Sequence, residues 1–267
     1  MQPSPMTPAT IAQKFVEARR TATPLTDYPG PIPVSLGVAY AVQDEAIKLV
    51  DQSIVGWKVG RIMPPVSDTY GAERLSGPIF ASHVQMENGA NVAQIFDGGF
   101  GAAEAEFLLR IGHDLPIGKS DYSLDQAAAI VDAVHIGIEI ASSPFAGINA
   151  HGPTVTASDF GNNNGLIVGA SLTDWSSHDF AQWDVKTLID GVEVGCGKAS
   201  AFPDGPLGSV RFLLNNLGER GIAVAAGTWI STGAVSGVHA VRVGQRVEAF
   251  FGETMALRCT VEAATAA

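Results

Sequence analysis

The stretch VHIGIEIASS, residues 134–143, constrains the fold more than any other part of the sequence. Its aliphatic residues Val134, Ile136, Ile138 and Ile140 occupy every second position, which predicts a β-strand with one wholly apolar face. The opposite face holds small or polar residues, among them Glu139. A carboxylate inside an apolar run needs a partner if that face is also buried.

Helical spacing of apolar residues occurs mainly in the first fifty residues. It predicts helices at Thr10–Arg20 and over residues 38–50, joined by a proline-rich connector. A later helix is predicted over residues 207–221, ending near a glycine. Residues 53–61 resemble a short buried strand, and residues 63–80 a loop long enough to be a lid or a binding loop.

From about residue 76 the sequence consists of short strands separated by glycines. Residues 185–197 predict a hairpin with a type I′ turn at Asp190–Gly191, and residues 238–252 predict two further strands. We therefore expect an α+β fold with a mixed or mainly antiparallel sheet. A helical N-terminal region would cover residues 1–75, and a β-rich body residues 76–267.

Composition excludes several classes of function. The formal net charge of −11 leaves no basic stripe for nucleic acid. Runs of 18 or more apolar residues are absent from the sequence, so we expect no membrane span. The first ten residues lack the basic and apolar segments of a secretory signal. Cys196 and Cys259 lie far apart, which suits the reducing cytoplasm, where we expect the protein.

Two more glutamates repeat the pattern of Glu139. In AAEAEFLLRIG, Glu104 and Glu106 are two residues apart and share one face of a strand. Two close buried carboxylates raise each other's pKa unless a cation lies between them. With Glu139 on a neighbouring strand they would form an all-oxygen site, which favours Mg²⁺ or Mn²⁺ over Zn²⁺. A solvent-facing strand surface is the alternative, although the flanking alanines leave room for a bound group.

Other candidate residues are less specific. Lys58, in the apolar stretch GWKVG, needs an anionic partner, either a substrate carboxylate or a structural acid. The histidines form no HxH or HxxxH pair, and His135 is noted because it shares the face of Glu139. GNNNG, residues 161–165, fits a polar turn or a loop that contacts substrate. Neither a phosphate-binding loop nor a GxSxG motif is present in the sequence.

Seven segments in order resemble the fumarylacetoacetate hydrolase superfamily, in the branch of 2-keto-4-pentenoate hydratase and 4-oxalocrotonate decarboxylase. They are GWKVG, GPIF, EAEFLL, VHIGIEIASS, SDFGNNNGLIVGA, GPLGSVRFLLNNLGERG and AGTWISTGA. The resemblance implies a mixed β-roll body after a small helical region. It also implies Mg²⁺ or Mn²⁺ held by Glu104, Glu106 and Glu139, with Lys58 at the substrate pocket.

The resemblance further implies a short 2-oxo acid substrate that chelates the metal through its carboxylate and oxo oxygens. A metal-stabilised enolate would serve hydration, decarboxylation and C–C hydrolysis alike. The first expectation is a hydratase of 2-keto-4-pentenoate type in aromatic catabolism, working as a homo-oligomer. The alternatives are a 4-oxalocrotonate-type decarboxylase, an acylpyruvate hydrolase and a non-catalytic paralogue that binds a small acid.

Several positions depart from the pattern of the branch. SDFGN replaces the usual ADNGS, so Phe160 and Asn162 stand in place of an amide and a hydroxyl residue. Leu75 and Ser76 stand where an acidic residue is usual before GPIF. We expect these four residues to contact substrate together with Lys58. Asp159, which keeps its acidic character, or a water on the metal would move protons.

Overall fold

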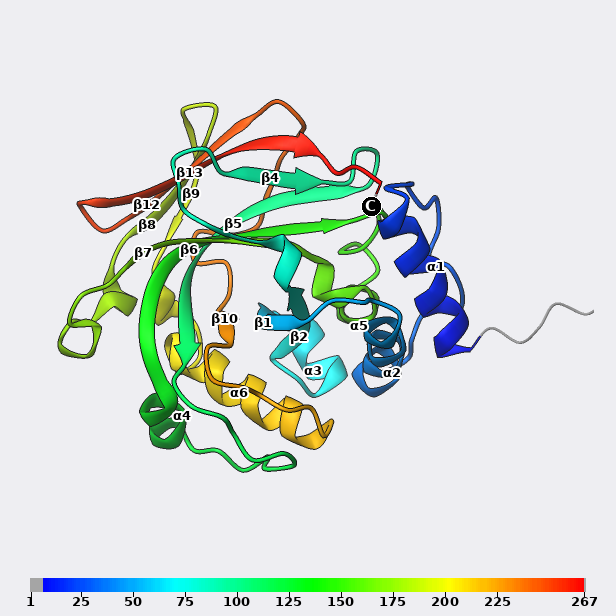
Figure 1. Cartoon of the computed structure of the whole chain (residues 1–267), viewed down its shortest axis with the longest axis horizontal. Helices are drawn as coiled ribbons and strands as arrows, with labels where there is room; N and C mark the ends of the chain where they lie inside the picture. The colour runs from blue at the N-terminus through cyan, green and yellow to red at the C-terminus, as the bar shows by residue number, and fades with distance from the viewer. Residues whose placement is uncertain (1–6, 267) are drawn as a thin grey trace, which may run out of the picture.

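Two β-sheets form the body of the molecule, and helices cover its margins (Figure 1). The computed structural model describes residues 7–266 and confirms the α+β class. The helices are α1 (Pro8–Arg20), α2 (Leu36–Lys48), α3 (Val66–Tyr70), α4 (Leu124–Ile130), α5 (Pro153–Ser158) and α6 (Gly205–Glu219). The strands are β1 (Ile54–Arg61), β2 (Arg74–Phe80), β3 (Val84–Met86), β4 (Val92–Ile95), β5 (Phe100–Ile111), β6 (Val131–Ser143), β7 (Asn163–Ser171), β8 (Val185–Ile189), β9 (Val192–Gly197), β10 (Trp229–Ser231), β11 (His239–Ala240), β12 (Arg246–Phe251) and β13 (Met255–Ala263).

Both sheets are mixed, as the sequence predicts. The 8-stranded sheet has the order β2-β1-β10-β5-β6-β7-β3, and β11 pairs with β5 outside that path. The 5-stranded sheet has the order β4-β13-β12-β8-β9. Strands β1 and β10, β3 and β7, and β4 and β13 run parallel, whereas the other pairs are antiparallel. The predicted hairpin of β8 and β9 is present, with positive φ at Asp190 and Gly191.

The apolar face of β6 lies in the main core, as the alternation predicts. Its aliphatic side chains are fully buried against those of β12 and β13 from the second sheet. Phe107 of β5 lies on the same side and packs edge-on against Phe180 and Phe251. The two sheets thus enclose one face of β5 and β6, which leaves the opposite face of these strands for the three glutamates.

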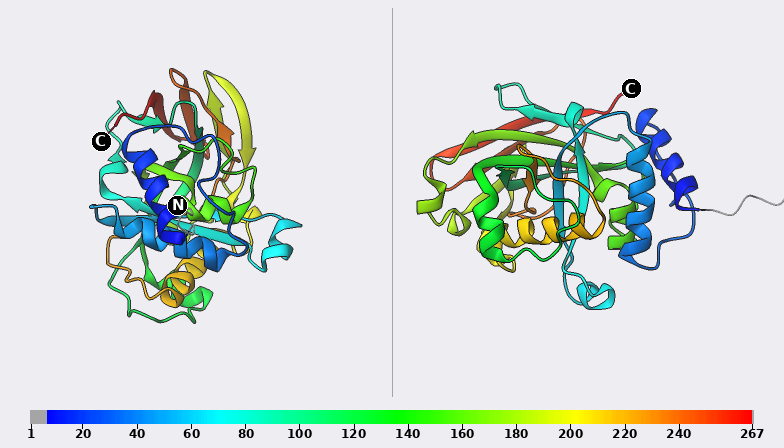
Figure 2. Two further views of the ribbon diagram at one scale, coloured as in Figure 1. Left: turned by 90° about the vertical axis from the view of Figure 1, so that its right-hand side faces the viewer. Right: turned by 60° about the horizontal axis from the view of Figure 1, so that its bottom comes forward.

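Helices α1 and α2 stand side by side at one end of the sheets (Figures 1 and 2). Their N-termini are capped by Thr7 and Ser35, whose side chains accept hydrogen bonds from backbone N–H groups in the first turn. Phe15 of α1 and Val42 of α2 contribute to a second core, which also contains Phe160. The N-terminal helices are thereby packed against the segment that precedes β7.

Three expectations about individual elements need correction. Residues 74–80, taken as loop, form the buried strand β2, because Gly77 and Pro78 hide its strand pattern and both faces are covered. The second helix spans residues 36–48, so Val50 lies beyond it, and Val38 is 41% exposed. After residue 252 the chain adds β13, which the sequence pattern did not indicate. The expected boundary between residues 75 and 76 falls inside β2, and β1 belongs to the larger sheet.

Among residues 7–266, every helix is too short or too polar to cross a lipid bilayer. Residues 1–6, on which the expected lack of a secretory signal largely rests, lie outside the described part of the chain.

Candidate metal centre

The pairing of β5 with β6 brings the three glutamates together. Glu104 lies directly opposite Glu139, and Glu106 follows two residues along β5 on the same face. All three side chains are buried, and each offers one carboxylate oxygen within 4.8 Å of the others. The three glutamates that were predicted from the sequence to form one site therefore lie together in the structure.

A single lysine balances these carboxylates. Lys58 projects from β1 and is 4% exposed, and its Nζ lies 3.2 Å from Oε2 of Glu139. The same Nζ donates a long hydrogen bond of 3.4 Å to Oδ1 of Asn162. One positive charge beside three carboxylates leaves the cluster with an excess of negative charge when all three are ionised.

Polar groups from β7 and the region of β10 hold two of the carboxylates in place. Asn163 Nδ2 donates to Oε1 of Glu139 over 2.9 Å. The Ser231 hydroxyl and the backbone N–H of Gly233 both donate to Oε2 of Glu106, the latter over 2.8 Å. These contacts engage one oxygen of each carboxylate.

The remaining oxygens test whether the site fits a cation. Oε1 of Glu106 and Oε2 of Glu139 are buried and accept no hydrogen bond, and the latter has only its ion pair with Lys58. Buried carboxylate oxygens without hydrogen-bond partners are costly unless a cation ligates them. Two such oxygens, in a cluster of three buried carboxylates within ligand distance of one another, fit a hard divalent cation, for which carboxylates are preferred ligands.

Burial changes the acidity of these groups. It raises the pKa of Glu104 to about 7, with the charge of Glu139 adding to this and Lys58 opposing it. Burial and the charges of Glu139 and Glu104 raise the pKa of Glu106 well above its ordinary range. Burial acts to lower the pKa of Lys58, but the three glutamates outweigh it, so that this pKa is raised and the lysine stays protonated. Without a cation the cluster would therefore retain protons near neutral pH.

The centre opens onto a cleft of about 770 Å³. Lys58 and Glu104 line its inner end, and a hydrogen-bonded row of side chains continues from Lys58 through Asn162 and Asn149 to Thr156. The segment between β1 and β2, which projects from the body in Figure 2, supplies apolar residues to the cleft margin. The cleft thus combines a charged inner end with a largely apolar wall.

Of the residues predicted from the sequence to contact substrate, some line the cleft and others do not. Leu75 and Asn162 line the cleft. Ser76 lies elsewhere, where its hydroxyl donates to Oδ1 of Asn216 over 2.8 Å, because alternate residues of β2 face opposite sides. Phe160 packs edge-on against Phe80 in the second core and does not line the cleft.

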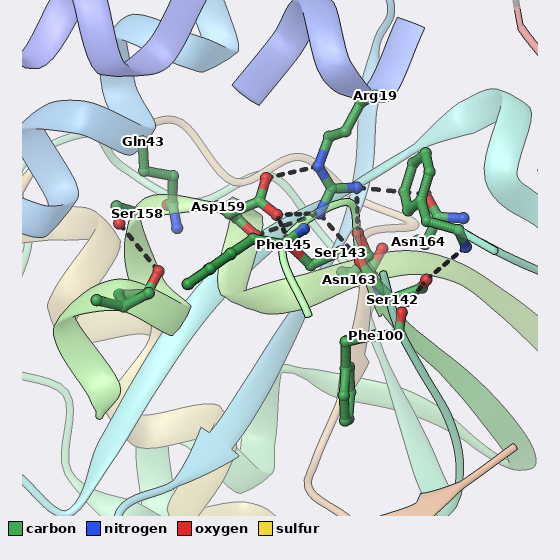
Figure 3. A network of polar contacts seen from close by, with 12 residues as sticks. Arg19, Gln43, Phe100, Ser142, Ser143, Phe145, Ser158, Asp159, Asn163 and Asn164 are labelled. Carbon is green, nitrogen blue, oxygen red and sulfur yellow. Dashed lines mark hydrogen bonds and ion pairs between the residues drawn. The ribbon is translucent and has the colours of Figure 1, made fainter. Parts of the chain in front are cut away.

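Asp159 also lies outside the cleft lining, in a separate polar network (Figure 3). Arg19 of α1 donates to both carboxylate oxygens, over 2.6 Å and 3.0 Å, and the Ser143 hydroxyl donates over 2.6 Å. Further Arg19 hydrogen bonds reach the carbonyls of Asn163 and Ser142. The predicted role of Asp159 in proton transfer is not supported by this placement, because its oxygens are engaged by Arg19 and Ser143.

The segment after Asp159 adopts a strained turn. Phe160, Gly161 and Asn162 all have positive φ, at 54°, 62° and 58°. Residues other than glycine rarely adopt this backbone conformation. A Cβ on Gly161 would lie 2.9 Å from Cδ of Lys58. This turn sets Asn162 beside Lys58 and delivers Asn163 to Glu139, so the strain occurs where the chain supports the site.

Several site residues had no recognisable signal in the sequence. Ser231 and Gly233 belong to the segment AGTWISTGA, and Asn163 belongs to GNNNG. Both segments were recognised in the sequence, but their contacts with Glu106 and Glu139 were not predicted. Asn149 and Thr156 were not noted, since polar residues in a loop and a short helix suit many roles.

Comparisons with known proteins identify solved structures of similar fold. A scan of family models found no match. The structure of 4-oxalocrotonate decarboxylase from Pseudomonas putida G7, complexed with magnesium and adipate, aligns with a TM-score of 0.78 at 22% identity, over 95% of this chain and 97% of that chain. The same enzyme complexed with calcium and acetate aligns with a TM-score of 0.77 at 22% identity, over 95% and 96% of the two chains.

A fumarylpyruvate hydrolase from Pseudomonas aeruginosa, solved with Mn²⁺ and pyruvate, aligns with a TM-score of 0.55 at 16% identity, over 80% of this chain and 93% of that chain. Identities this low establish the fold and not the reaction. The chain thus has the fumarylacetoacetate hydrolase type of fold that its sequence predicts.

Proposed function

We propose that this chain is a divalent-cation-dependent lyase acting on short 2-oxo acids. The observation that supports it most is the trio of buried carboxylates, Glu104, Glu106 and Glu139, of which Glu104 lines a cleft. Support also comes from the solved structures of similar fold, which contain magnesium, calcium or manganese together with small carboxylic acids. Mg²⁺ or Mn²⁺ is the proposed cation.

The proposed roles of the residues follow from their positions. Glu104, Glu106 and Glu139 would hold the cation, which as a Lewis acid would draw electron density from the 2-oxo oxygen. Lys58 stays protonated in its buried position and lines the cleft, so it would bind the negative charge of the substrate. Asn162 holds the Lys58 side chain, and the apolar wall would exclude bulk water from the reacting carbons.

The cleft favours decarboxylation over the other reactions of this group. Among residues 7–266, its titratable lining consists of Lys58, Arg61, Glu104 and Lys198, without a histidine. The His–Glu pair that acyl hydrolysis would need therefore has no support. Decarboxylation requires no activated water: the bond from the carboxylate carbon to the chain breaks, CO₂ leaves, the conjugated oxo group accepts the electron pair, and a proton later adds to carbon.

Hydration, the first expectation from the sequence, is the second candidate. The row of Asn162, Asn149 and Thr156 along the cleft offers donors and acceptors that would hold a water near the substrate chain. Asp159, the proposed proton carrier, is not part of this row. Hydration would therefore depend on proton exchange through neutral side chains or bulk water.

An ultraviolet assay with three substrates separates these possibilities. The metal-free protein receives Mg²⁺, Mn²⁺ or chelator, together with 2-oxohex-3-enedioate, 2-hydroxypenta-2,4-dienoate or an acylpyruvate. We expect metal-dependent release of CO₂ from the first substrate. If 2-hydroxypenta-2,4-dienoate instead loses its dienol absorbance and the product contains one added water, the reaction is hydration. Cleavage of the acylpyruvate alone would refute the lyase proposal, and a folded, metal-binding protein that is inactive on all three would favour the non-catalytic paralogue.

A further inference from the structure

A second cavity, of about 350 Å³, lies beside the turn of Phe160–Asn162 and has no role in the proposed chemistry. It shares no lining residue with the cleft at the metal centre. Phe160, at the start of the turn, lines the second cavity, whereas Asn162, at its end, lines the cleft. The turn therefore contributes to both spaces.

The walls of the second cavity are largely aromatic. Phe80, Phe96 and Phe160, each at most 4% exposed, line it, and we call it the aromatic cavity. The rings of Phe80 and Phe160 meet edge-on with their centres 5.1 Å apart. Val16 of α1 and Leu49, which is 46% exposed, complete the apolar lining. A flat apolar molecule would gain from burial and from contact with these rings.

The cationic side chains of the aromatic cavity are already paired. Arg19 forms the ion pair with Asp159 (Figure 3), and all three nitrogens of its guanidinium donate to acceptors within the protein. Arg20 is paired with Glu17, and Asp51, the acid in the lining, is exposed. Burying a carboxylate here would be costly, because Arg19 has no nitrogen left to receive it. The cavity therefore favours an uncharged ligand.

His83 supplies a polar group without a partner. The rings of His135 and His239 each bond a backbone carbonyl, whereas the ring of His83 makes no hydrogen bond within residues 7–266. It lines the aromatic cavity. Burial and the charge of Arg19 lower its pKa, so the ring is neutral at neutral pH and one of its nitrogens accepts a hydrogen bond. A hydroxyl group is a donor of matching chemistry.

The aromatic cavity is also connected to the metal centre. Asn163 lines the cavity, and its Nδ2 donates to Oε1 of Glu139. A ligand packed against Phe160 and Asn163 would stabilise the backbone arrangement that presents Asn163 to Glu139. Two ligands that favour one arrangement tighten each other's binding by the same factor.

We propose that the aromatic cavity is a regulatory binding site for an uncharged aromatic alcohol, which packs against the phenylalanine rings and donates its hydroxyl to His83. The bound alcohol strengthens cation binding at Glu104, Glu106 and Glu139 through the turn. The inference goes beyond the proposed function, because it requires no turnover. Phe160 is a position at which the sequence departs from the pattern of the branch, so the site belongs to this chain and not to that pattern.

Binding of small aromatic probes tests the proposal. p-Cresol and toluene, which differ by one hydroxyl, are titrated calorimetrically into the metal-free protein. We expect p-cresol to bind with a Kd of about 1 mM or tighter and at least about threefold more tightly than toluene, an effect typical of one hydrogen bond. The charged analogue 4-methylbenzoate should not displace p-cresol.

Three variants locate the bound probe. Val16→Trp fills the aromatic cavity, and Phe160→Asn removes a ring while placing at this positive φ a residue that tolerates it. Both should weaken p-cresol binding at least about tenfold. His83→Phe keeps a ring but removes the acceptor, so p-cresol and toluene should bind equally. The matched control Val238→Trp adds the same bulk to the cleft at the metal centre and should leave p-cresol binding unchanged. Circular dichroism and thermal melting verify that each variant is folded.

Titration of Mn²⁺ measures the connection to the metal centre. Saturating p-cresol should tighten Mn²⁺ binding about fivefold in the wild type and have no effect in Val16→Trp.

An absence of saturable p-cresol binding, displacement by 4-methylbenzoate, or an affinity that survives Val16→Trp would each overturn the inference. So would Mn²⁺ binding that is the same with and without p-cresol. The proposed function fails separately, if the protein shows this linkage but turns over no 2-oxo acid.

Discussion

At the scale of single residues, the balance of charge around Glu104, Glu106 and Glu139 governs the behaviour of the site. Lys58 supplies one positive charge, whereas three ionised carboxylates would supply three negative ones. Either protons or a divalent cation must make up the difference. The stability of the metal-free protein should therefore fall as the pH rises. The stabilisation gained by binding a cation should grow over the same range.

The first prediction concerns pH. Burial raises the folded-state pKa of Glu104 to about 7, above its ordinary value of 4.5, and the pKa of Glu106 is also raised well above its ordinary value. A raised carboxyl pKa stabilises the metal-free fold below about pH 4.5, and this stabilisation is lost as the pH rises through 7. A cation replaces the protons, so its affinity falls as the pH drops below 7.

Thermal melting between pH 5.5 and 8.5 measures this effect. At a hundred times Kd a cation adds about 2.7 kcal/mol to stability, which corresponds to several degrees in Tm. We expect the Mg²⁺-induced rise in Tm to be larger at pH 8 than at pH 6. A rise that is independent of pH would contradict the assignment of these carboxylates.

A second prediction separates Lys58 from the metal ligands. Lys58→Met removes the group proposed to bind the substrate charge, so turnover should fall at least about a hundredfold. Cation affinity should be unchanged or higher, because a positive charge near the site has been removed. Parallel loss of Mn²⁺ binding and turnover would show instead that Lys58 organises the carboxylates.

At the scale of elements, the segment from α5 into β7 connects the N-terminal helix to the site. Arg19 of α1 binds Asp159 (Figure 3). Four residues later, Asn163 binds Glu139. Between them the turn of Phe160–Asn162 has left-handed backbone angles. The anchor at Asp159 thus holds a strained turn that reaches the metal centre.

The third prediction is that Asp159 matters for stability and not for proton transfer. Breaking its buried pair with Arg19 by Asp159→Asn should cost about 3–5 kcal/mol in the free energy of unfolding. The control Asp132→Asn, which breaks the exposed pair with Arg110, should cost less than about 1 kcal/mol. Urea denaturation measures both. Loss of one limb of the pH–rate profile in Asp159→Asn would restore the role that the sequence indicated.

The fourth prediction concerns the contact between β2 and the turn. A Cβ at Gly77 would lie 1.9 Å from the Phe160 carbonyl oxygen. Gly77→Ala must displace the turn, so we expect a loss of at least about 1–3 kcal/mol together with weaker Mn²⁺ binding. In Gly37→Ala, within α2, the new methyl meets no atom closer than 3.9 Å, and the variant should be as stable or up to about 1 kcal/mol more stable. Equal effects on Mn²⁺ affinity would contradict this account.

Local pattern explains which elements the sequence could predict. The alternation in β6 and the helical spacing in α6 each place apolar residues on one buried face, so both elements were predicted. Strand β2 has all seven residues buried and includes Gly77 and Pro78, so it shows neither alternation nor strand-forming composition. The pair of Arg19 and Asp159 spans 140 residues, and no local pattern identifies such a partner.

At the scale of the whole molecule, the site is a product of strand order. Lys58, Ser231, Glu106, Glu139 and Asn163 come from β1, β10, β5, β6 and β7, which are consecutive neighbours in the larger sheet. In the sequence these strands are interrupted by helices and by the second sheet. The sequence proposed the three glutamates through spacing and resemblance, whereas the supporting contacts depend on this order.

Assembly and location remain predictions of the sequence. A homo-oligomer would be detected by analytical ultracentrifugation, and cytoplasmic location by fractionation of cells.

The central claim is that the buried glutamates form a divalent-cation centre, and calorimetric titration of Mn²⁺ into the metal-free protein tests it most directly. The wild type should bind one cation per chain. Glu106→Gln should weaken this binding at least about a hundredfold, whereas Glu253→Gln, in the exposed turn between β12 and β13, should leave it unchanged. A wild type that binds no cation, or binding that is equal in Glu106→Gln, would contradict the claim.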